Sequence, residues 1–141
     1  MPASAEPELL VDTSVAVALV VSDHEQHEAI GEALAHRRLG LAGHAAFETF
    51  SVLTRLPPPL RRTPWAVGRL LASNFSDSRF LDADAAGKLL TRLPTLGIAG
   101  GAVYDALVGA AALQHQLRLA TRDRRAMDTY RALDIDLEVL A

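Results

Sequence analysis

The sequence predicts a single α/β domain in which a parallel β-sheet carries helices on both faces. Two observations support this fold class. Short apolar runs alternate with segments of helical spacing along the chain, and neither an internal repeat nor a domain linker interrupts them. The 141 residues, half of them hydrophobic, suffice for one core. We therefore expect one domain over residues 1–141 that begins with a flexible tail over residues 1–8.

The first apolar run, Leu9-Leu10-Val11, predicts a buried strand that ends at Asp12. The hydroxyl of Thr13 or Ser14 is expected to cap the next helix, because such oxygens accept hydrogen bonds from the free N–H groups of a helix start. That helix is short and very apolar, over residues 15–21.

The following segment has the spacing of a capping box, with Ser22 as N-cap and Glu25 three residues later, and predicts a helix to about residue 37. A second strand is expected over residues 39–42. Apolar residues at helical spacing then predict a helix over residues 44–56, which three consecutive prolines end.

The second half of the chain continues this alternation. Its expected elements are a helix over 65–74 with Thr63 as N-cap and Pro64 first, a weak third strand over 79–81, a helix from Asp82 or Asp84 to Leu93, a helix over 102–116, a fourth strand over 117–121, a helix over 124–133 and a closing strand over 137–140.

Charge and composition restrict the class of function. The net charge of −3 argues against general electrostatic affinity for nucleic acid, although a local basic strip stays possible. The absence of cysteine excludes disulfides and thiolate metal sites. The acidic start lacks a basic signal-peptide region, and no apolar run approaches the roughly 18 residues of a membrane span. We expect a soluble cytoplasmic protein that does not associate with membranes.

Four acidic residues stand out by their context: Asp12, Glu48, Asp105 and Asp123. Asp12 and Asp123 follow predicted strands, and groups at the carboxyl ends of parallel strands gather at one edge of the sheet. Glu48 lies on a polar stripe of its helix. Asp105 belongs to a helix that is apolar or small all round, where an unpaired carboxylate is costly.

Each acid also has a purely structural alternative. Asp12 and Asp123 could cap helices, Glu48 could face solvent, and Asp105 could pair with a buried arginine.

If the four acids converge, their repulsion requires protons or a cation. At an effective dielectric constant near 20, two carboxylates about 6 Å apart repel by roughly 3 kcal/mol. Oxygen ligands without cysteine favour Mg²⁺ or Mn²⁺ over zinc. Such ions can activate a water and stabilise the leaving oxygen of a phosphodiester, which is metal-dependent nuclease chemistry.

The residues around these acids resemble, in order, the motifs of PIN-domain ribonucleases, and most closely those of the VapC toxins of VapBC toxin–antitoxin pairs. The matching segments are Leu10-Val11-Asp12-Thr13-Ser14, Phe47-Glu48 with Leu53-Thr54-Arg55, Tyr104-Asp105-Ala106-Leu107 and Thr121-Arg122-Asp123-Arg124-Arg125. The resemblance covers about residues 9–140.

This resemblance implies a PIN-like three-layer fold whose five-stranded parallel sheet has the order 3-2-1-4-5. It also implies Mg²⁺- or Mn²⁺-dependent hydrolysis of tRNA, rRNA or mRNA through a metal-activated water. Further implications are homodimerisation and inhibition by a cognate VapB-type antitoxin. The four acids carry over as catalytic metal ligands, with Ser14 and Thr121 as supporting hydroxyls.

Other residues allow two interpretations. Arg122, Arg124 and Arg125 could hold RNA phosphates or form a solvated helix start. Tyr104 could stack on a base or pack at an interface, whereas Trp65 is expected to pack.

The histidines His24 and His27 lack a third ligand nearby and are expected at the surface. The apolar helix over residues 15–21 is expected to help line a groove for the antitoxin.

Two rival functions stay open. A haloacid-dehalogenase-like phosphatase also uses an acid after its first strand, but it needs a second aspartate where this chain has Ser14. A catalytically idle PIN-like binding module would act through an interface alone, and Mn²⁺ would not stabilise it.

Overall fold

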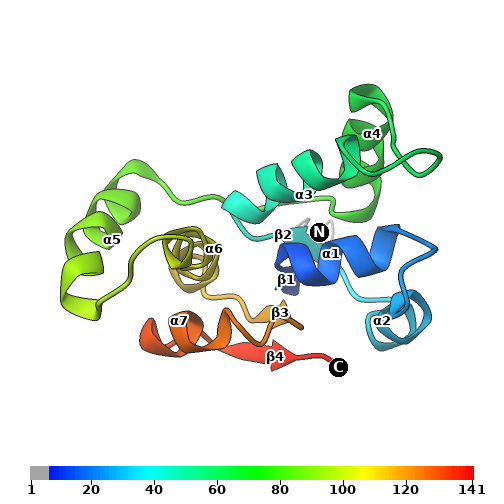
Figure 1. Cartoon of the computed structure of the whole chain (residues 1–141). Helices are drawn as coiled ribbons and strands as arrows, with labels where there is room; N and C mark the ends of the chain where they lie inside the picture. Colours follow the sequence, from blue (N-terminus) through cyan, green and yellow to red (C-terminus); the bar gives the residue numbers. More distant parts are fainter. Residues whose placement is uncertain (1–6) are drawn as a thin grey trace, which may run out of the picture.

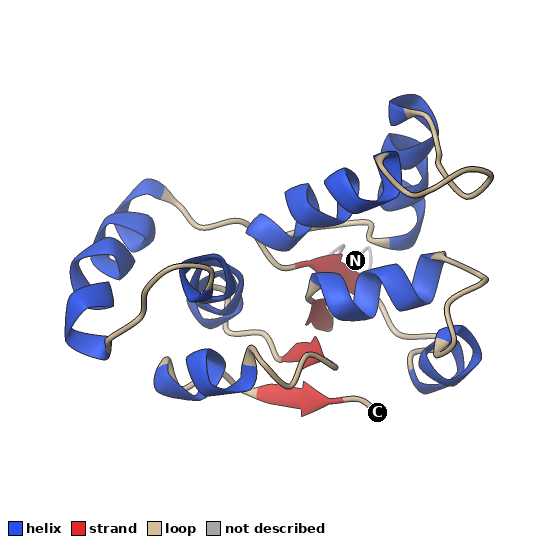
Figure 2. Ribbon diagram, viewed as in Figure 1, coloured by secondary structure: helices blue, strands red, loops and turns tan. Residues whose placement is uncertain are grey.

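The computed structural model describes residues 7–141 and contains a four-stranded parallel sheet of order β2-β1-β3-β4 (Figures 1 and 2). The strands are β1 (Leu9–Val11), β2 (Leu39–Leu41), β3 (Leu119–Thr121) and β4 (Leu137–Val139). The helices are α1 (Thr13–Val20), α2 (His27–Ala33), α3 (His44–Thr54), α4 (Pro64–Asn74), α5 (Ala83–Leu96), α6 (Ala102–Gln114) and α7 (Met127–Ala132). The predicted α/β class is confirmed.

Helices cover both faces of the sheet. Figure 1 shows α1 and α2 on one side and α5, α6 and α7 on the other, while α3 and α4 lie beyond the β2 edge. Alternate strand residues enter the two cores, so Leu9 and Val11 pack with α1 and α2, whereas Leu10 packs with α6 and α7. Because both faces are buried, β1, β2 and β3 contain almost only apolar residues.

The expected third strand over residues 79–81 is wrong in extent. Only Arg79 pairs, through an isolated parallel bridge to Ala42. Phe80 is exposed and Leu81 is half-buried, so neither apolar side chain is buried deeply enough to hold a full edge strand. The chain then turns into α5, whose N-cap is Asp82. The bridge lies beside β2, where the order 3-2-1-4-5 places the third strand, but the sheet has four strands.

Two of the capping predictions were correct. Thr63 accepts a hydrogen bond from the Ala66 N–H at the start of α4, and Asp82 caps α5. The first helix is capped by Asp12 rather than by Thr13 or Ser14. The predicted capping box at Ser22 is wrong as well.

In that region α2 begins only at His27. The preceding residues form turns, in which the His24 N–H donates to the Val21 carbonyl and His24 Nδ1 accepts from the Gln26 N–H. These local hydrogen bonds replace a helical turn.

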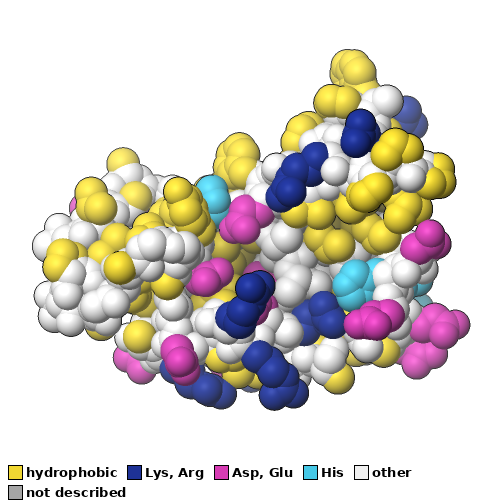
Figure 3. All heavy atoms as spheres, viewed as in Figure 1, with side chains coloured by type: hydrophobic (Ala, Val, Ile, Leu, Met, Phe, Trp, Pro, Cys, Tyr) yellow, Lys and Arg dark blue, Asp and Glu magenta, His cyan; other side chains and the backbone are white. Residues whose placement is uncertain are grey.

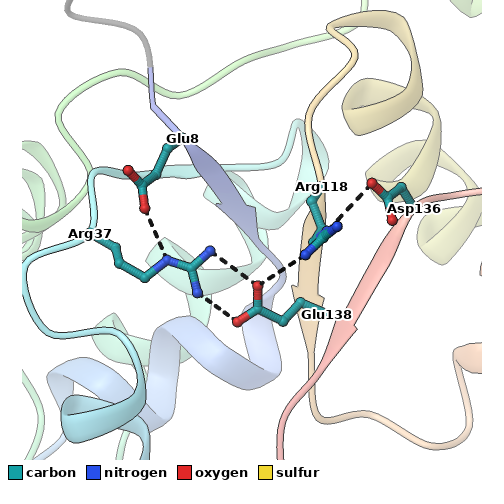
Figure 4. Close-up of polar contacts among 5 residues, drawn as sticks. All are labelled: Glu8, Arg37, Arg118, Asp136 and Glu138. Atoms are coloured by element: carbon teal, nitrogen blue, oxygen red, sulfur yellow. Dashed lines mark hydrogen bonds and ion pairs between the residues drawn. The ribbon is translucent and has the colours of Figure 1, made fainter.

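The amino ends of the strands are joined by ion pairs (Figure 4). Arg37 donates to Glu8 at 3.0 Å and binds Glu138 through two nitrogens at 2.6 and 3.1 Å. Arg118 contacts Asp136 at 3.4 Å and Glu138 at 3.9 Å. This network ties together segments that precede or belong to all four strands. It lies at the opposite end of the strands from Asp12.

The predicted tail over residues 1–8 falls mainly outside the described residues. At its described end, Pro7 is buried and Glu8 is held by Arg37. Within residues 7–141, no helix is long and apolar enough to cross a membrane.

Candidate active site

The four predicted acids come together at the carboxyl edge of the sheet. Asp12 follows β1, Asp123 lies two residues after β3, Glu48 comes from the middle of α3, and Asp105 comes from the first turn of α6. Their side chains line one cavity of about 40 Å³, together with Thr13, Ser14, Val108 and Tyr130. A cavity of this volume holds an ion or a few waters. A nucleotide would therefore have to bind at its mouth.

Asp12 is the centre of this arrangement and is only 4% exposed. Its Oδ1 accepts hydrogen bonds from Ser14 Oγ at 2.5 Å and from the Val15 N–H at 3.2 Å. Its Oδ2 accepts from Thr121 Oγ1 at 2.5 Å and from the Tyr130 hydroxyl at 3.0 Å. Burial raises the pKa of Asp12, and these four donors oppose that rise.

The hydroxyl groups of Ser14 and Thr121 connect Asp12 to the loop after β3. Ser14 Oγ accepts from the Arg122 N–H at 3.0 Å, and Thr121 Oγ1 accepts from the Asp123 N–H at 3.1 Å. Because β1 and β3 are neighbouring parallel strands, these short bonds fix Asp123 beside Asp12. The supporting positions predicted for the two hydroxyls therefore have a direct geometric basis.

Burial also raises the pKa of Asp105 on α6 and of Glu48 on α3, which line the same cavity. The pKa of Asp105 rises to about 6, chiefly through burial and further through the charges of the other three acids, while Arg125 partly opposes the rise. The pKa of Glu48 is raised mainly by burial, with His44 acting in the opposite direction and Asp12 and Asp123 adding to the rise. The cavity therefore contains more negative charge than it can stabilise without protons or cations.

Asp105 is half-buried rather than enclosed in the core. Its helix α6 is buried mainly from Ala106 onward, so that the first turn, with Asp105, reaches the cavity. The prediction that this acid would be electrostatically strained is nevertheless supported by its raised pKa.

The donor set suits a hard divalent cation, because four carboxylates supply only oxygen ligands. The four side chains do not form a coordination shell. Among residues 7–141, no group of three or more His, Cys, Asp or Glu side chains is close enough to hold a metal. The shared cavity, its oxygen donors and the raised pKa values of Glu48 and Asp105 fit a cation site.

The three arginines near Asp123 differ from one another. Arg125 ion-pairs with Asp123 at 3.6 Å and its side chain is otherwise almost fully exposed. Arg124 is exposed. Arg122 is half-buried, and its Nε has no hydrogen-bond partner in the described part of the chain. Arg124 and Arg125 therefore present charge beside the cavity mouth.

Tyr130 was missed by the sequence reasoning. It is 1% exposed and comes from α7, with its hydroxyl on Asp12. Burial raises its pKa, and the nearby Asp12 charge adds to the rise, so the phenol stays protonated and donates. A tyrosine on the inner face of a short helix needs a buried partner for its hydroxyl, which was the one available signal.

The remaining expectations have mixed outcomes. Trp65 does not pack, because it is 84% exposed. Tyr104 stacks on the His44 ring with a centroid separation of 5.1 Å and stays half exposed. His24 and His27 are partly exposed, and His27 Nδ1 lies 3.0 Å from the Ala18 carbonyl oxygen.

The apolar segment 15–21 is mostly buried in the domain's own core. Only Val17 and Leu19 stay partly exposed on it. Its lack of polar residues is therefore largely explained by packing within the domain.

Comparison with known proteins gives consistent matches along the chain. The family model described as PIN domain matches residues 9–132. Ribonuclease VapC27 of Mycobacterium tuberculosis is 47% identical over 136 residues, which is 96% of this chain and 99% of that protein. Ribonuclease VapC40 of the same species is 47% identical over 131 residues, which is 92% of this chain and 96% of that protein.

Two solved structures share the fold at low identity. VapBC2 from Rickettsia felis, bound to a DNA fragment from its promoter, is 17% identical with a TM-score of 0.67, covering 94% of this chain and 98% of that chain. VapC20 of Mycobacterium tuberculosis, a Sarcin-Ricin loop cleaving toxin, is 18% identical with a TM-score of 0.68, covering 90% of this chain and 95% of that chain.

Proposed function

Because this chain belongs to the PIN-domain family, we propose that it is an endoribonuclease that acts as the toxin of a toxin–antitoxin pair. The observation that carries this proposal is the cavity at the carboxyl edge of the sheet, which four carboxylates from four separate segments line. The 47% identity to two proteins named as VapC ribonucleases supports it over the phosphatase and the idle binding module.

We also propose that Asp12, Glu48, Asp105 and Asp123 hold one or two Mg²⁺ or Mn²⁺ ions. When bound, such an ion supplies Lewis acidity, which activates water and offsets charge that develops on the phosphodiester. All-oxygen ligands and the raised pKa values of the carboxyl groups support this choice.

The protein's own contribution is to hold Asp12 in one orientation. Its four hydrogen bonds fix both oxygens, and two of the donors also anchor the backbone of the loop that carries Asp123. Such supporting hydrogen bonds keep carboxylates charged and aligned. Arg124 and Arg125 are exposed next to Asp123, and Arg125 pairs with it at 3.6 Å, so we assign these two arginines contacts with RNA phosphates.

Partners and location follow from the same proposal. A VapB-type antitoxin is the expected inhibitor, with Val17 and Leu19 on α1 as candidate contacts. We expect a homodimer that acts on tRNA, rRNA or mRNA in the cytoplasm.

Substitution of the cavity acids tests the function. Asp12→Asn and Asp105→Asn should each abolish RNA cleavage and growth inhibition while the far-ultraviolet circular dichroism spectrum is retained. Asp84→Asn is the matched control, because Asp84 is exposed and pairs only with Lys88 on α5. Full cleavage by either cavity variant would contradict the proposal.

Two further measurements separate the rival functions. Trapping of a phosphoryl group on Asp12 would favour the phosphatase. Mn²⁺ should raise the melting temperature of the wild type, and no stabilisation at millimolar Mn²⁺ would favour the idle binding module.

A further inference from the structure

The end of α3, the loop after it and α4 form a surface that we call the basic arm, defined by Arg55, Arg61, Arg62 and Arg69. Residues 49–76 contain these four arginines and no acidic residue, although the whole chain has 17 acidic and 14 basic residues. All four are exposed. Figure 3 shows basic side chains over α3 and α4, on the same face as acidic side chains near the starts of α3 and α6.

The charges of the basic arm are not neutralised within the described chain. Arg62 and Arg69 have no ion pair or side-chain hydrogen bond there. Arg55 and Arg61 donate only to neutral oxygens, the Ser51 hydroxyl at 3.3 Å and the Leu56 carbonyl at 2.8 Å. By contrast, the arginines at the amino ends of the strands bind carboxylates. The arm therefore keeps its positive charge available for an anionic ligand.

One helix face connects the basic arm to the acidic cavity. His44, Glu48, Ser51 and Arg55 recur at helical spacing on α3 and, with Phe47 and Val52, line a continuous hollow. Glu48 also lines the acidic cavity. Arg55, the C-cap of α3, lies seven positions after Glu48, a rise of about 10 Å. This corresponds to roughly three stacked nucleotides.

A second, separate hollow lies on α4. It is lined by Arg62, Ala66, Arg69, Leu70 and Ser73. Trp65, one helical turn before Arg69, has 84% of its surface exposed and no aromatic neighbour among the described rings. An exposed tryptophan beside unpaired arginines is the combination that binds single-stranded nucleic acid, because the ring stacks on bases and the guanidinium groups bind phosphates.

We propose that the basic arm binds the phosphate backbone of a single-stranded RNA segment that extends from the acidic cavity along α3, with Trp65 stacked on one of its bases. The choice of RNA rests on the proposed ribonuclease function. It is favoured over an acidic protein segment because the hollow along α3 shares Glu48 with the cavity suited to a phosphodiester, and because the ring of Trp65 on α4 is exposed. The arm also offsets the repulsion that a cavity of four carboxylates exerts on an incoming backbone.

The sole tryptophan gives a direct test, because Trp65 is the only one in the chain. Poly(U) is a suitable probe, and EDTA prevents metal-dependent cleavage. Titration of the full chain with poly(U) should quench the Trp65 emission along the same curve as the fluorescence anisotropy of labelled poly(U). Unchanged Trp65 emission at saturating poly(U) would overturn the stacking contact and, with it, the proposed path.

A charge variant tests the phosphate contacts independently. Arg62→Ala with Arg69→Ala should weaken poly(U) binding and reduce the slope of log affinity against log salt by about 1.4, because each phosphate contact on a single strand contributes about 0.7. Arg92→Ala with Arg131→Ala is the matched control, since both arginines are exposed and without ion pairs among the described residues. Equal affinity and slope in the two double variants would refute the proposal.

Two further outcomes are decisive. If the arm variant keeps poly(U) binding but loses binding to poly-glutamate, the arm is a protein-docking surface and the proposal fails. If Asp12→Asn leaves cleavage unchanged while the arm variant loses poly(U) binding, the proposed active site fails and the arm assignment stands.

Discussion

Replacement of Tyr130 by phenylalanine tests how the cavity keeps a buried charge in place. The ring is 1% exposed and its packing is preserved in phenylalanine, so the change removes only the hydrogen bond to Asp12 Oδ2 at 3.0 Å. A hydrogen bond to a charged group contributes about 1.5–3 kcal/mol. Because Thr121 still donates to the same oxygen, we expect a loss of about 2 kcal/mol at pH 7.5.

The loss should depend on pH. Burial raises the pKa of folded Asp12 above its unfolded value, and the Tyr130 hydroxyl partly opposes that rise. A carboxyl group with a raised folded pKa stabilises the fold at low pH and loses that contribution as pH rises through the folded pKa. Removal of the hydroxyl raises the folded pKa further. The variant should therefore lose more stability at pH 7.5 than at pH 4.

Thermal melting in EDTA measures both effects. In a domain of this size, 1 kcal/mol corresponds to about 3 °C, so the Tm should fall by about 6 °C at pH 7.5 and by clearly less at pH 4. Tyr104→Phe is the control, because Tyr104 is half exposed and is the only other tyrosine. An equal fall at both pH values, or an equal fall in the control, would refute the reasoning.

Four other substitutions have defined outcomes. Asp105→Asn should raise the Tm of the metal-free protein at pH 7.5 but not at pH 4. The folded pKa of Asp105 is about 6, so its ionised form destabilises the fold only at the higher pH. A rise in Tm at both pH values would contradict this. Gly40→Ala should destabilise by more than about 1 kcal/mol, since its Cβ would lie 2.5 Å from the backbone oxygen of Asp77. Gly68→Ala, on an open helix face, should instead stabilise by up to about 1 kcal/mol, and denaturant unfolding of the two variants checks both signs. Glu138→Gln should lower the free energy of unfolding by about 1 kcal/mol at low salt and by less at 1 M salt, because it weakens the ion pair with Arg37. A loss of stability that does not depend on salt would argue against an electrostatic role.

Much of the fold could be predicted from the sequence because its signals are local. The apolar runs of β1 and β3, the proline after Thr63 and the acid at Asp82 each mark an element through neighbouring residues alone. The capping box at Ser22 shows the weakness of such signals, since alternative turns around His24 satisfied the same backbone groups.

The four acids were found for a related reason. In a parallel sheet, strand ends meet at one edge, so the position of Asp12 and Asp123 after their strands implied that they share that edge. The strand order that the family resemblance implies then placed them side by side. The apolar surroundings of Asp105 on α6 marked it as electrostatically unusual, and helical spacing placed Glu48 on a polar stripe of α3.

What the sequence by itself determined is therefore the α/β class, the family, most of the order of the elements and the four acids that line the cavity. Only the tertiary structure decided how Asp12 is held, because its bonds to Thr121 and Tyr130 join residues 109 and 118 positions apart. It also decided that residues 79–81 form a single bridge and that Trp65 is exposed beside unpaired arginines. Such features depend on which distant segments pack together, and local sequence patterns do not encode that choice.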